Sequence, residues 1–331
     1  MNYNFVMTYN KSFSLILHSK MNIYSDINAL YADNCVATVG MFDGLHCGHI
    51  SLLNELKLRA KSLCLPTTVI TIWPHPQKVL ADSCAGIKLL NTFDEKLKLF
   101  SNTGIDNLVI LPFTHDFANI SAERFISDYL INKIHAQFLL LGYNHHFGNS
   151  KKQPSDYISL CKSLGLEAAY APQFFFDNNI KCSSSEIRKY LSAGNVIQAN
   201  KLLGYSYCVS GMVIHGDSIG SKINFPTANI SLVDTDKLLP AKGVYATYAT
   251  IDENRYKSLT NIGIRPTLTN AEFRFETHIL NFDGNLYDRE ITVEFVDKIR
   301  DEIKFNNLQE LEFQICQDVI RATETIFYGN K

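Results

Sequence analysis

The hydrophobic positions of this chain follow two different periods, one in each half. From about residue 35 to residue 180, short apolar runs alternate with stretches in which apolar residues recur every three or four positions. Continuous apolar runs predict strands buried on both faces, and the stretches between them predict amphipathic helices. The first half is therefore predicted to form a parallel sheet with right-handed crossovers. The predicted strands cover residues 35–39, 67–72, 108–111 and 138–141.

The segment from His49 to Leu63 follows the first predicted strand and has the spacing of an amphipathic helix. It places four apolar residues on one face: Ile50, Leu53, Leu56 and Leu63. Parallel sheets bind their ligands beyond the carboxyl ends of the strands, in the turns that lead into helices. His46 and His49 fall in the first of these turns, which makes it the first place to expect a binding site.

From about residue 205 onward, strand-like segments follow one another without helices between them, and several alternate in polarity. Turn signals such as residues 283–285, Asp-Gly-Asn, separate them. This density of strands predicts a small closed antiparallel barrel. The predicted strands cover residues 207–214, 243–251, 256–264, 273–282 and 286–296. A final amphipathic segment, residues 308–326, predicts a helix that packs on the barrel through Leu308, Leu311, Ile315, Val319 and Ala322.

The change of period predicts two domains, residues 22–195 and 205–331, with the boundary within residues 193–204. The predicted fold class is α/β plus β: a Rossmann-like domain with a parallel sheet, then a small antiparallel β-barrel with a terminal helix. Residues 1–20 contain Lys11 and Lys20 but no acidic residue, and their apolar stretch is too short for a signal-peptide core. We expect residues 1–21 to be a loosely ordered extension, with Met21 as an alternative start. An organelle-targeting leader is the less favoured alternative.

Composition excludes some classes of function. With 46% apolar residues, 19% charged residues and a net charge of −2, the chain is predicted to have no broad basic surface for nucleic acid. No apolar run is long enough to span a bilayer. The eight cysteines include no C-x-x-C pair, which argues against a zinc cage and against a disulfide framework. Reduced, mostly buried thiols in a cytoplasmic protein are expected instead. The oligomeric state stays open.

The turn after the first predicted strand has the composition of a phosphate site. Glycines at positions 40, 44 and 48 permit tight turning and a close approach of the backbone to phosphate oxygens. The helix that follows supplies unpaired N–H groups and a partial positive charge. His46 and His49 can donate hydrogen bonds to a phosphoryl group as negative charge develops on it. The alternative, a glycine-rich turn with two surface histidines, is disfavoured because strand, glycines, histidines and helix agree in order.

Residues 40–49 fit the motif G-x-F-D-G-x-H-x-G-H, which resembles the FAD synthetase module of bacterial bifunctional riboflavin kinase/FMN adenylyltransferases. Residues 71–76, 141–148 and 183–188 resemble further elements of that module. The resemblance implies a nucleotidyltransferase that joins AMP to FMN and releases pyrophosphate. It implies catalytic roles for His46, His49 and Arg188, with the guanidinium of Arg188 holding the pyrophosphate. It also implies ATP or phosphate contacts for Gly40, Phe42, Gly44, Gly48, Ser184 and Ser185, and flavin or ATP contacts for His75, Asn144 and Phe147.

Residues 225–229, Phe-Pro-Thr-Ala-Asn, are the strongest signal in the second half. Thr227 and Asn229 are two residues apart on an extended segment, so their side chains project to one face. Their oxygens suit a hard cation such as Mg²⁺, which would also bind substrate phosphates. Gly216 and Gly220 bracket a turn that could close over the phosphates, with Lys222 as the cation. Taken alone, the string is also compatible with an ordinary turn and strand start.

This segment resembles the flavokinase signature, and the resemblance continues through residues 243–246, 261–267, 276–280 and 299–305. The resemblance implies that Glu276 is the general base, which takes the proton from the riboflavin 5′-hydroxyl as that oxygen attacks the γ-phosphorus of ATP. The alternative for Glu276 alone is a solvent-facing strand carboxylate. Riboflavin, FMN and FAD are then substrates and products, ATP is the co-substrate, and Mg²⁺ assists both steps.

Together the resemblances cover residues 22–327 and imply a bifunctional enzyme that makes FMN and then FAD. Two alternatives stay open: an adenylyltransferase for another phosphate ester, and a non-catalytic flavin-binding protein. The second is motivated by departures from the family pattern at His145, His146, Asn224 and Asp288. Retention of the histidines, Arg188, Thr227, Asn229 and Glu276 argues against it.

Overall fold

The computed structural model of the protein describes residues 21–27, 34–80, 86–143, 154–177, 180–216, 225–266 and 271–327. The predicted extension, residues 1–21, lies outside these ranges except for Met21. The chain divides into two compact units, Met1–Cys182 and Ser183–Lys331. No helix in the described ranges is both long and apolar enough to cross a membrane.

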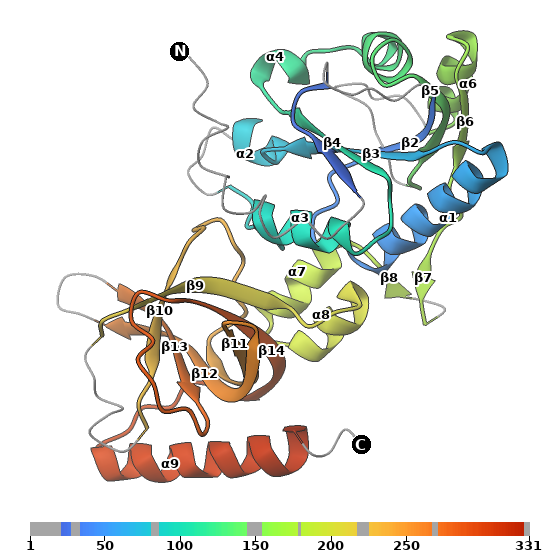
Figure 1. The fold of residues 1–331 in the computed structure, drawn as a ribbon. Coiled ribbons are helices and arrows are strands. Elements are labelled where there is room, and N and C mark those ends of the chain that lie inside the picture. Colours follow the sequence, from blue (N-terminus) through green and yellow to red (C-terminus); the bar gives the residue numbers. More distant parts are fainter. Residues whose placement is uncertain are drawn as a thin grey trace. The chain divides into compact units, whose positions relative to one another are not determined.

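A six-stranded parallel sheet forms the first unit, as the apolar runs predict (Figure 1). The strands lie in the order β1-β4-β3-β2-β5-β6. They are β1 (Asn22–Tyr24), β2 (Cys35–Gly40), β3 (Thr67–Trp73), β4 (Asn107–Pro112), β5 (Ala136–Leu141) and β6 (Glu167–Tyr170). The apolar pattern does not predict the edge strands β1 and β6, because three or four residues of mixed polarity carry no clear period. A small two-stranded sheet joins β7 (Phe175–Phe176) to β8 (Ile180–Lys181).

Helices cover both faces of the parallel sheet, because alternate residues of each strand point to opposite sides. Val36 and Leu108 belong to a core with α1 (Cys47–Leu63) and α3 (Phe93–Ser101). Ala37 and Val109 belong to a second core on the other face. That core includes residues of α5 (Ala122–Arg124), the π-helical segment η2 (Phe125–Ile131) and α6 (Pro154–Ser163). Two short helices also belong to the unit: α2 (Pro76–Leu80) and α4 (His115–Ala118).

Helix α1 begins two residues earlier than predicted and buries a different set of residues. Its buried side chains are Leu52, Leu53, Leu56 and Ala60. The prediction that Leu63 lies on this face is wrong, since that side chain is 42% exposed. At about 100° per residue, ten positions turn Leu63 about 80° away from Leu53.

The second unit contains a closed antiparallel barrel, as predicted (Figure 1). Its strands follow the order β10-β13-β12-β11-β14-β9 around the barrel. They are β9 (Cys208–Ile214), β10 (Ala228–Leu232), β11 (Gly243–Ile251), β12 (Asn254–Pro266), β13 (Ala271–Ile279) and β14 (Glu290–Arg300).

The inside of the barrel is partly polar. Four hydroxyl-bearing side chains, Thr247, Ser258, Thr260 and Thr277, are fully buried there. Thr247 Oγ1 lies 2.8 Å from both Ser258 Oγ and Thr260 Oγ1, and Thr260 Oγ1 lies 2.9 Å from Thr277 Oγ1. Each hydroxyl is both donor and acceptor, so this chain of hydrogen bonds satisfies groups that would otherwise be costly to bury.

Two helices of the second unit pack against the barrel ahead of its first strand. They are α7 (Ser184–Ser192) and α8 (Val196–Leu203). In α8, the Asn200 amide donates to the carbonyl of Phe295, at 2.8 Å. In α7, the carbonyl of Leu191 accepts from the amide of Ala241, at 2.9 Å. The two compact units divide between Cys182 and Ser183. The domain boundary within residues 193–204 and the activity that α7 serves stay predictions.

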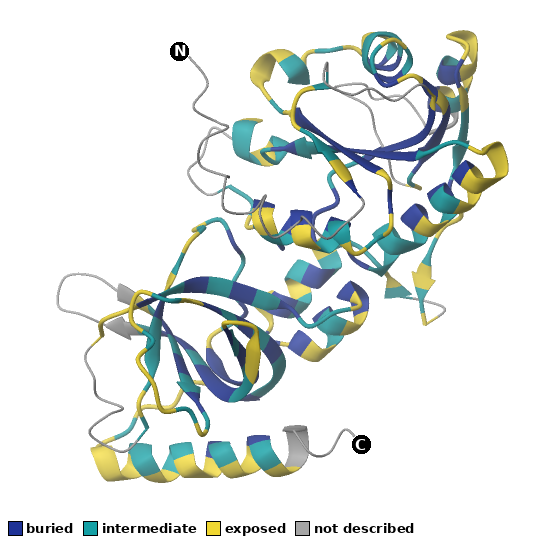
Figure 2. Ribbon diagram, in the orientation of Figure 1, coloured by how far each residue is buried: buried dark blue, intermediate teal, exposed yellow. Residues whose placement is uncertain are grey.

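The terminal helix α9 (Leu308–Arg321) lies against the outside of the barrel, where Figure 2 shows it largely exposed. Asn307 caps its start by accepting from the amide of Glu310. Val319 and Ala322 pack on barrel residues as predicted, whereas Leu308 is 46% exposed. Few apolar side chains attach α9 to the barrel, so polar contacts between the two are important.

An ion pair anchors α9 to β14. Arg300 Nε donates to both carboxylate oxygens of Asp318, at 3.0 and 2.9 Å. Gln314 on the same helix also donates to Asp318, at 3.0 Å. The Asp318 side chain is only 4% exposed and that of Arg300 15%. Solvent therefore screens this pair far less than a surface pair.

Asp318→Asn is expected to loosen α9, because the half-buried guanidinium of Arg300 would keep its charge and lose its charged partner. The expected cost is about 3 kcal/mol, or roughly 100-fold faster amide exchange in residues 308–321. Asp301→Asn is the matched control, since Asp301 pairs with Lys298 at the surface with 87% of its side chain exposed. Hydrogen exchange measured by mass spectrometry checks both variants. If α9 exchanged at the same rate in Asp318→Asn as in Asp301→Asn, the role of the ion pair as an anchor would be contradicted.

All cysteines in the described ranges are free, and fewer are buried than predicted. Only Cys35 and Cys161 are buried, whereas Cys47, Cys182 and Cys208 are half-buried and Cys64 and Cys316 are exposed. Cys64 follows the last residue of α1 and has a left-handed backbone conformation. Cys84 lies outside the described residues.

Candidate functional site

The turn between β2 and α1 is held in an unusual backbone conformation. Phe42, Gly44 and Leu45 all have positive φ, at 47°, 85° and 33°. The Phe42 ring folds back over Gly40, where a Cβ atom would lie only 2.9 Å from it. This ring is buried and makes edge contacts with His49 and Phe100, at centroid distances of 5.1 and 5.4 Å. The Phe42 ring thus packs against the ring of His49. The contact of Phe42 with ATP stays a prediction.

A buried acid and a buried base fix the same turn. The Asp43 carboxylate is 3% exposed and accepts from the amides of Leu90 and Asn91, at 3.1 and 3.3 Å. Lys96 on α3 is 1% exposed, and its Nζ donates to the carbonyl of Met41, at 2.8 Å. The sequence reasoning missed Lys96, because it acts on the turn from a segment far away in the chain. Asp43 belongs to the motif, but its structural role was missed because the amides it accepts from lie far away in the chain.

The two histidines of the motif stack face to face at the start of α1. Their ring centroids are 3.7 Å apart, with planes inclined by 17°. His46 is the residue before the first helical position, and His49 lies in the first turn. A Cβ atom on Gly48 would lie 3.2 Å from the His46 ring, so glycine leaves room for that ring. The structure therefore brings together His46, His49 and all three glycines of the motif.

Hydrogen bonding and burial indicate which ring nitrogen of His46 and of His49 carries the proton. The Sγ atom of Cys182 lies 3.4 Å from Nδ1 of His46. When the thiol donates this bond, the ring proton of His46 is on Nε2. Nδ1 of His49 is buried and has no hydrogen-bond partner among the described residues, which favours its unprotonated form. Burial, with His46 and Lys96 nearby, lowers the pKa of His49 well below its usual value. With Nδ1 unprotonated, the ring proton of His49 is on Nε2, so each ring offers an Nε2–H donor.

The other residues predicted for this site lie on other elements of the chain. His75 is half-buried just before α2, and its Nδ1 accepts from the amide of Gln77. Ser183 caps α7 by accepting from the amide of Glu186, so Ser184 and Ser185 are the first residues of that helix and Arg188 lies one turn further on. These residues belong to the second compact unit, and their contact with ATP stays a prediction. Asn144 and Phe147, with His145 and His146, lie outside the described residues.

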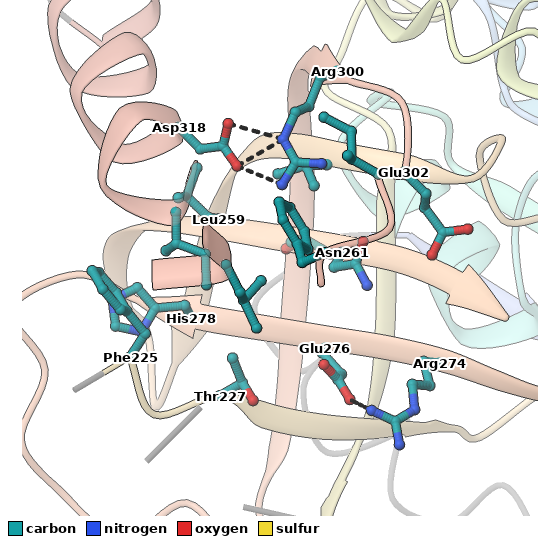
Figure 3. Close-up of a pocket in the computed structure, with 16 residues that line it drawn as sticks. Phe225, Thr227, Leu259, Asn261, Arg274, Glu276, His278, Arg300, Glu302 and Asp318 are labelled. Atoms are coloured by element: carbon teal, nitrogen blue, oxygen red, sulfur yellow. Dashed lines mark hydrogen bonds and ion pairs between the residues drawn. The ribbon is translucent and has the colours of Figure 1, made fainter. Parts of the chain in front are cut away.

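A second candidate site lies on the outer face of the barrel (Figure 3). Glu276 on β13 pairs in register with Asn229 on β10 and with Asn261 on β12. Residues directly opposite each other in an antiparallel ladder point to the same face, so the three side chains form one row. Arg274 lies two residues before Glu276 on the same face, and its Nη1 donates to Glu276 Oε1, at 3.0 Å. Period two along the strand is the signal that would have predicted Arg274.

Asn261, Glu276 and Arg274 form part of the wall of a cavity of about 300 Å³ beneath α9. The cavity combines apolar walls with polar and charged groups, which is typical of small-molecule sites. Leu259, Leu311 and Ile315 supply apolar surface, and Glu302 and Arg300 supply charge. The ion pair of Arg300 with Asp318 joins the barrel wall to the helix that covers the cavity (Figure 3).

The residues predicted to hold a metal lie beside Glu276. Thr227 lines the cavity, and Asn229 is the register partner of Glu276. Gly216 lies directly against the Asn229 amide, since a Cβ atom there would clash with its nitrogen. His278 steadies the segment through its Nδ1, 2.7 Å from the carbonyl of Pro226. The hydroxyl and amide oxygens fit a hard cation that also binds phosphates and water.

Three of the positions discussed for this second site lie outside the described residues: Gly220, Lys222 and Asn224. Asp288 has a φ of 60°, and its amide donates to the carbonyl of Val213, at 3.0 Å. Aspartate tolerates this left-handed conformation better than most residues, so a departure from glycine is accommodated there. Within the described ranges, no three His, Cys, Asp or Glu side chains are grouped so that they could hold a metal ion.

Comparison with known proteins finds relatives for both units. A family model of FAD synthetase matches residues 29–186, and a model of riboflavin kinase matches residues 203–326. The bifunctional riboflavin kinase/FMN adenylyltransferase of Escherichia coli (strain K12) is 35% identical over 301 residues, which is 90% of this chain and 94% of the relative. The protein of the same name from Buchnera aphidicola subsp. Acyrthosiphon pisum is 36% identical over 297 residues, 87% of this chain and 92% of the relative.

A solved structure covers nearly the same length. It is described as a macrolide-efflux protein from Streptococcus pneumoniae, and it superposes with a TM-score of 0.83 at 28% sequence identity. The match covers 92% of this chain and 99% of that chain.

Proposed function

Because the chain belongs to the family of bifunctional riboflavin kinase/FMN adenylyltransferases, we propose that its two candidate sites carry out the two reactions in turn. The barrel phosphorylates riboflavin with ATP to give FMN and ADP. The parallel-sheet unit then transfers AMP from a second ATP to FMN, which gives FAD and pyrophosphate. The observation that carries the proposal is the pair of family matches, one over each candidate site and in the expected order.

In the kinase reaction, we assign proton removal to Glu276. Its carboxylate accepts the proton of the riboflavin 5′-hydroxyl while that oxygen attacks the γ-phosphorus and ADP leaves. Arg274 holds the carboxylate in place through the 3.0 Å bond. Thr227 and Asn229 would hold Mg²⁺, which when bound neutralises charge on the phosphates. The cavity walls beneath α9 would receive the apolar ring system of the flavin.

In the adenylyl transfer, a phosphate oxygen of FMN attacks the α-phosphorus of ATP. No side-chain nucleophile is needed, so the protein contributes position and charge stabilisation. The Nε2–H groups of His46 and His49 donate to the α-phosphoryl oxygens as negative charge grows on them. The amides at the start of α1 add further donors. Arg188 is the candidate cation for the pyrophosphate, on the strength of its place in the serine-capped helix α7.

The partners that follow from this proposal are small molecules: riboflavin, FMN and ATP, with Mg²⁺. We place the reactions in the cytoplasm and expect no nucleic acid or membrane to take part. A net charge of −2 supports that expectation, since neither DNA nor an anionic bilayer would be attracted to the chain.

The proposal is tested by incubating purified protein with riboflavin, ATP and Mg²⁺ and separating the flavins by chromatography. FMN is expected to rise first and FAD to follow as FMN is consumed. FMN without FAD would contradict the adenylyl transfer. Neither product would favour the flavin-binding alternative. If the protein does not adenylylate FMN but does adenylylate another phosphate ester, such as phosphopantetheine, the alternative of an adenylyltransferase for that ester is supported.

A further inference from the structure

Helix α3 buries a lysine where its pattern calls for an apolar residue. The buried side chains of this helix are Phe93, Lys96, Leu97 and Phe100, which form one face at helical spacing. Thr92 and Glu95 form a capping box that fixes where the helix begins, so the lysine cannot shift to a more exposed position. An ammonium group is rarely buried without a specific partner, because it must give up its hydration.

The partners of Lys96 all lie around the turn between β2 and α1. Its Nζ donates to the carbonyl of Met41, at 2.8 Å, and lies 5.0 Å from the centroid of the Trp73 ring. The charged and titratable groups shown to interact with it are Asp43 and His49. The ammonium therefore belongs to the structure that supports His46 and His49, although no motif includes it.

We propose that Lys96 is a positioning residue for adenylyl transfer, which holds the turn at Met41 in place and puts a buried positive charge near His49. This inference rests on the adenylyl transfer proposed for that turn. A charge in a dry environment acts over several ångströms with little screening. It favours the neutral form of His49 and, at the same time, the negative charge that develops on the phosphoryl group.

The buried position of Lys96 makes the charge of its ammonium group depend on pH in a range where the activity can be measured. Burial lowers the pKa of Lys96 to about 8, although Asp43 partly opposes this shift. The native protein therefore loses this positive charge as the pH rises through about 8, while an unfolded chain keeps it up to about 10. Burial raises the pKa of Cys47 and of Cys182 above the usual range, so the thiols beside the histidines do not lose their protons in the same interval.

The test compares Lys96→Met and Lys96→Arg with wild-type protein in the conversion of supplied FMN to FAD. Methionine keeps the length and removes the charge, and arginine keeps a charge that does not titrate in this range. We expect Lys96→Met to lower kcat roughly 10- to 100-fold, as small displacements of reacting groups do. For wild type, kcat/KM for ATP, which reports groups of the free enzyme, should fall as the pH rises through about 8. Lys96→Arg should abolish that fall.

Lys98→Met is the matched control, since it removes an exposed lysine from the same helix. Riboflavin phosphorylation by each variant checks that the second unit is intact. If Lys96→Met unfolds the first unit, the pH profile of Lys96→Arg decides alone: a fall that persists near pH 8 overturns the inference. Full activity of Lys96→Met with an unchanged profile also overturns it. Wild-type protein that makes no FAD would instead refute the proposed adenylyl transfer itself.

Discussion

Glu276→Gln should abolish the conversion of riboflavin to FMN and leave the conversion of supplied FMN to FAD intact. Glutamine has the same shape but cannot accept the hydroxyl proton, and lost general-base catalysis costs roughly 10²- to 10⁴-fold in rate. The change also removes the charge that Arg274 pairs with at 3.0 Å, so the row of side chains loses its fixed geometry. The largest effect is expected on kcat, because proton transfer belongs to the transition state.

The measurement is the rate of FMN formation from riboflavin, with FAD formation from FMN followed in a parallel sample. Glu290→Gln is the matched control, since Glu290 is an exposed carboxylate on β14 of the same barrel. Equal loss of both activities in Glu276→Gln would contradict the assignment of the two reactions to separate units. Unchanged FMN formation would remove Glu276 from the mechanism.

His46→Ala should have the opposite selectivity, with FMN-to-FAD conversion falling 100-fold or more while riboflavin phosphorylation continues. The expected size follows from other enzymes, in which the loss of one donor to a developing negative charge costs roughly 10²- to 10³-fold. The His46 side chain makes no capping hydrogen bond to α1, so its removal does not deprive the helix of a cap. The stacked partner His49 would lose its neighbour at 3.7 Å and with it part of its orientation.

The same two assays check this variant, and His115→Ala, which removes an exposed histidine from α4, is the control. FAD formation at the wild-type rate would exclude His46 from the reaction. A parallel fall in riboflavin phosphorylation would mean that the substitution damages the whole chain rather than one site.

The order of elements could be predicted because hydrophobic burial leaves a period in the sequence. The buried strands of the parallel sheet appear as apolar runs, and four of them were predicted with ends within two residues. In the barrel the same reasoning gives five strands, misses β10 and does not give the faces of the strands. Thr247, Ser258, Thr260 and Thr277 point inward and bond to one another, so hydrophilic residues occupy positions that a polarity pattern assigns to solvent.

The local parts of the candidate sites could also be predicted, whereas the long-range parts could not. His46 and His49 are three residues apart at a helix start, where helical geometry alone brings side chains together. Lys96 follows Met41 by 55 residues, and a lysine on an amphipathic helix is ordinarily read as solvent-facing. The row of Asn229, Asn261 and Glu276 depends on strand register, which no local pattern specifies.

One further property follows from the residue against which Lys96 packs. The chain has a single tryptophan, and it is Trp73, only 8% exposed, in the unit that carries the histidine turn. Its ultraviolet emission is therefore a built-in optical reporter of that half of the molecule. Flavin emission lies at longer wavelength, so a rapid-mixing fluorimeter could record nucleotide arrival at one half and flavin turnover in the same cuvette without any attached dye.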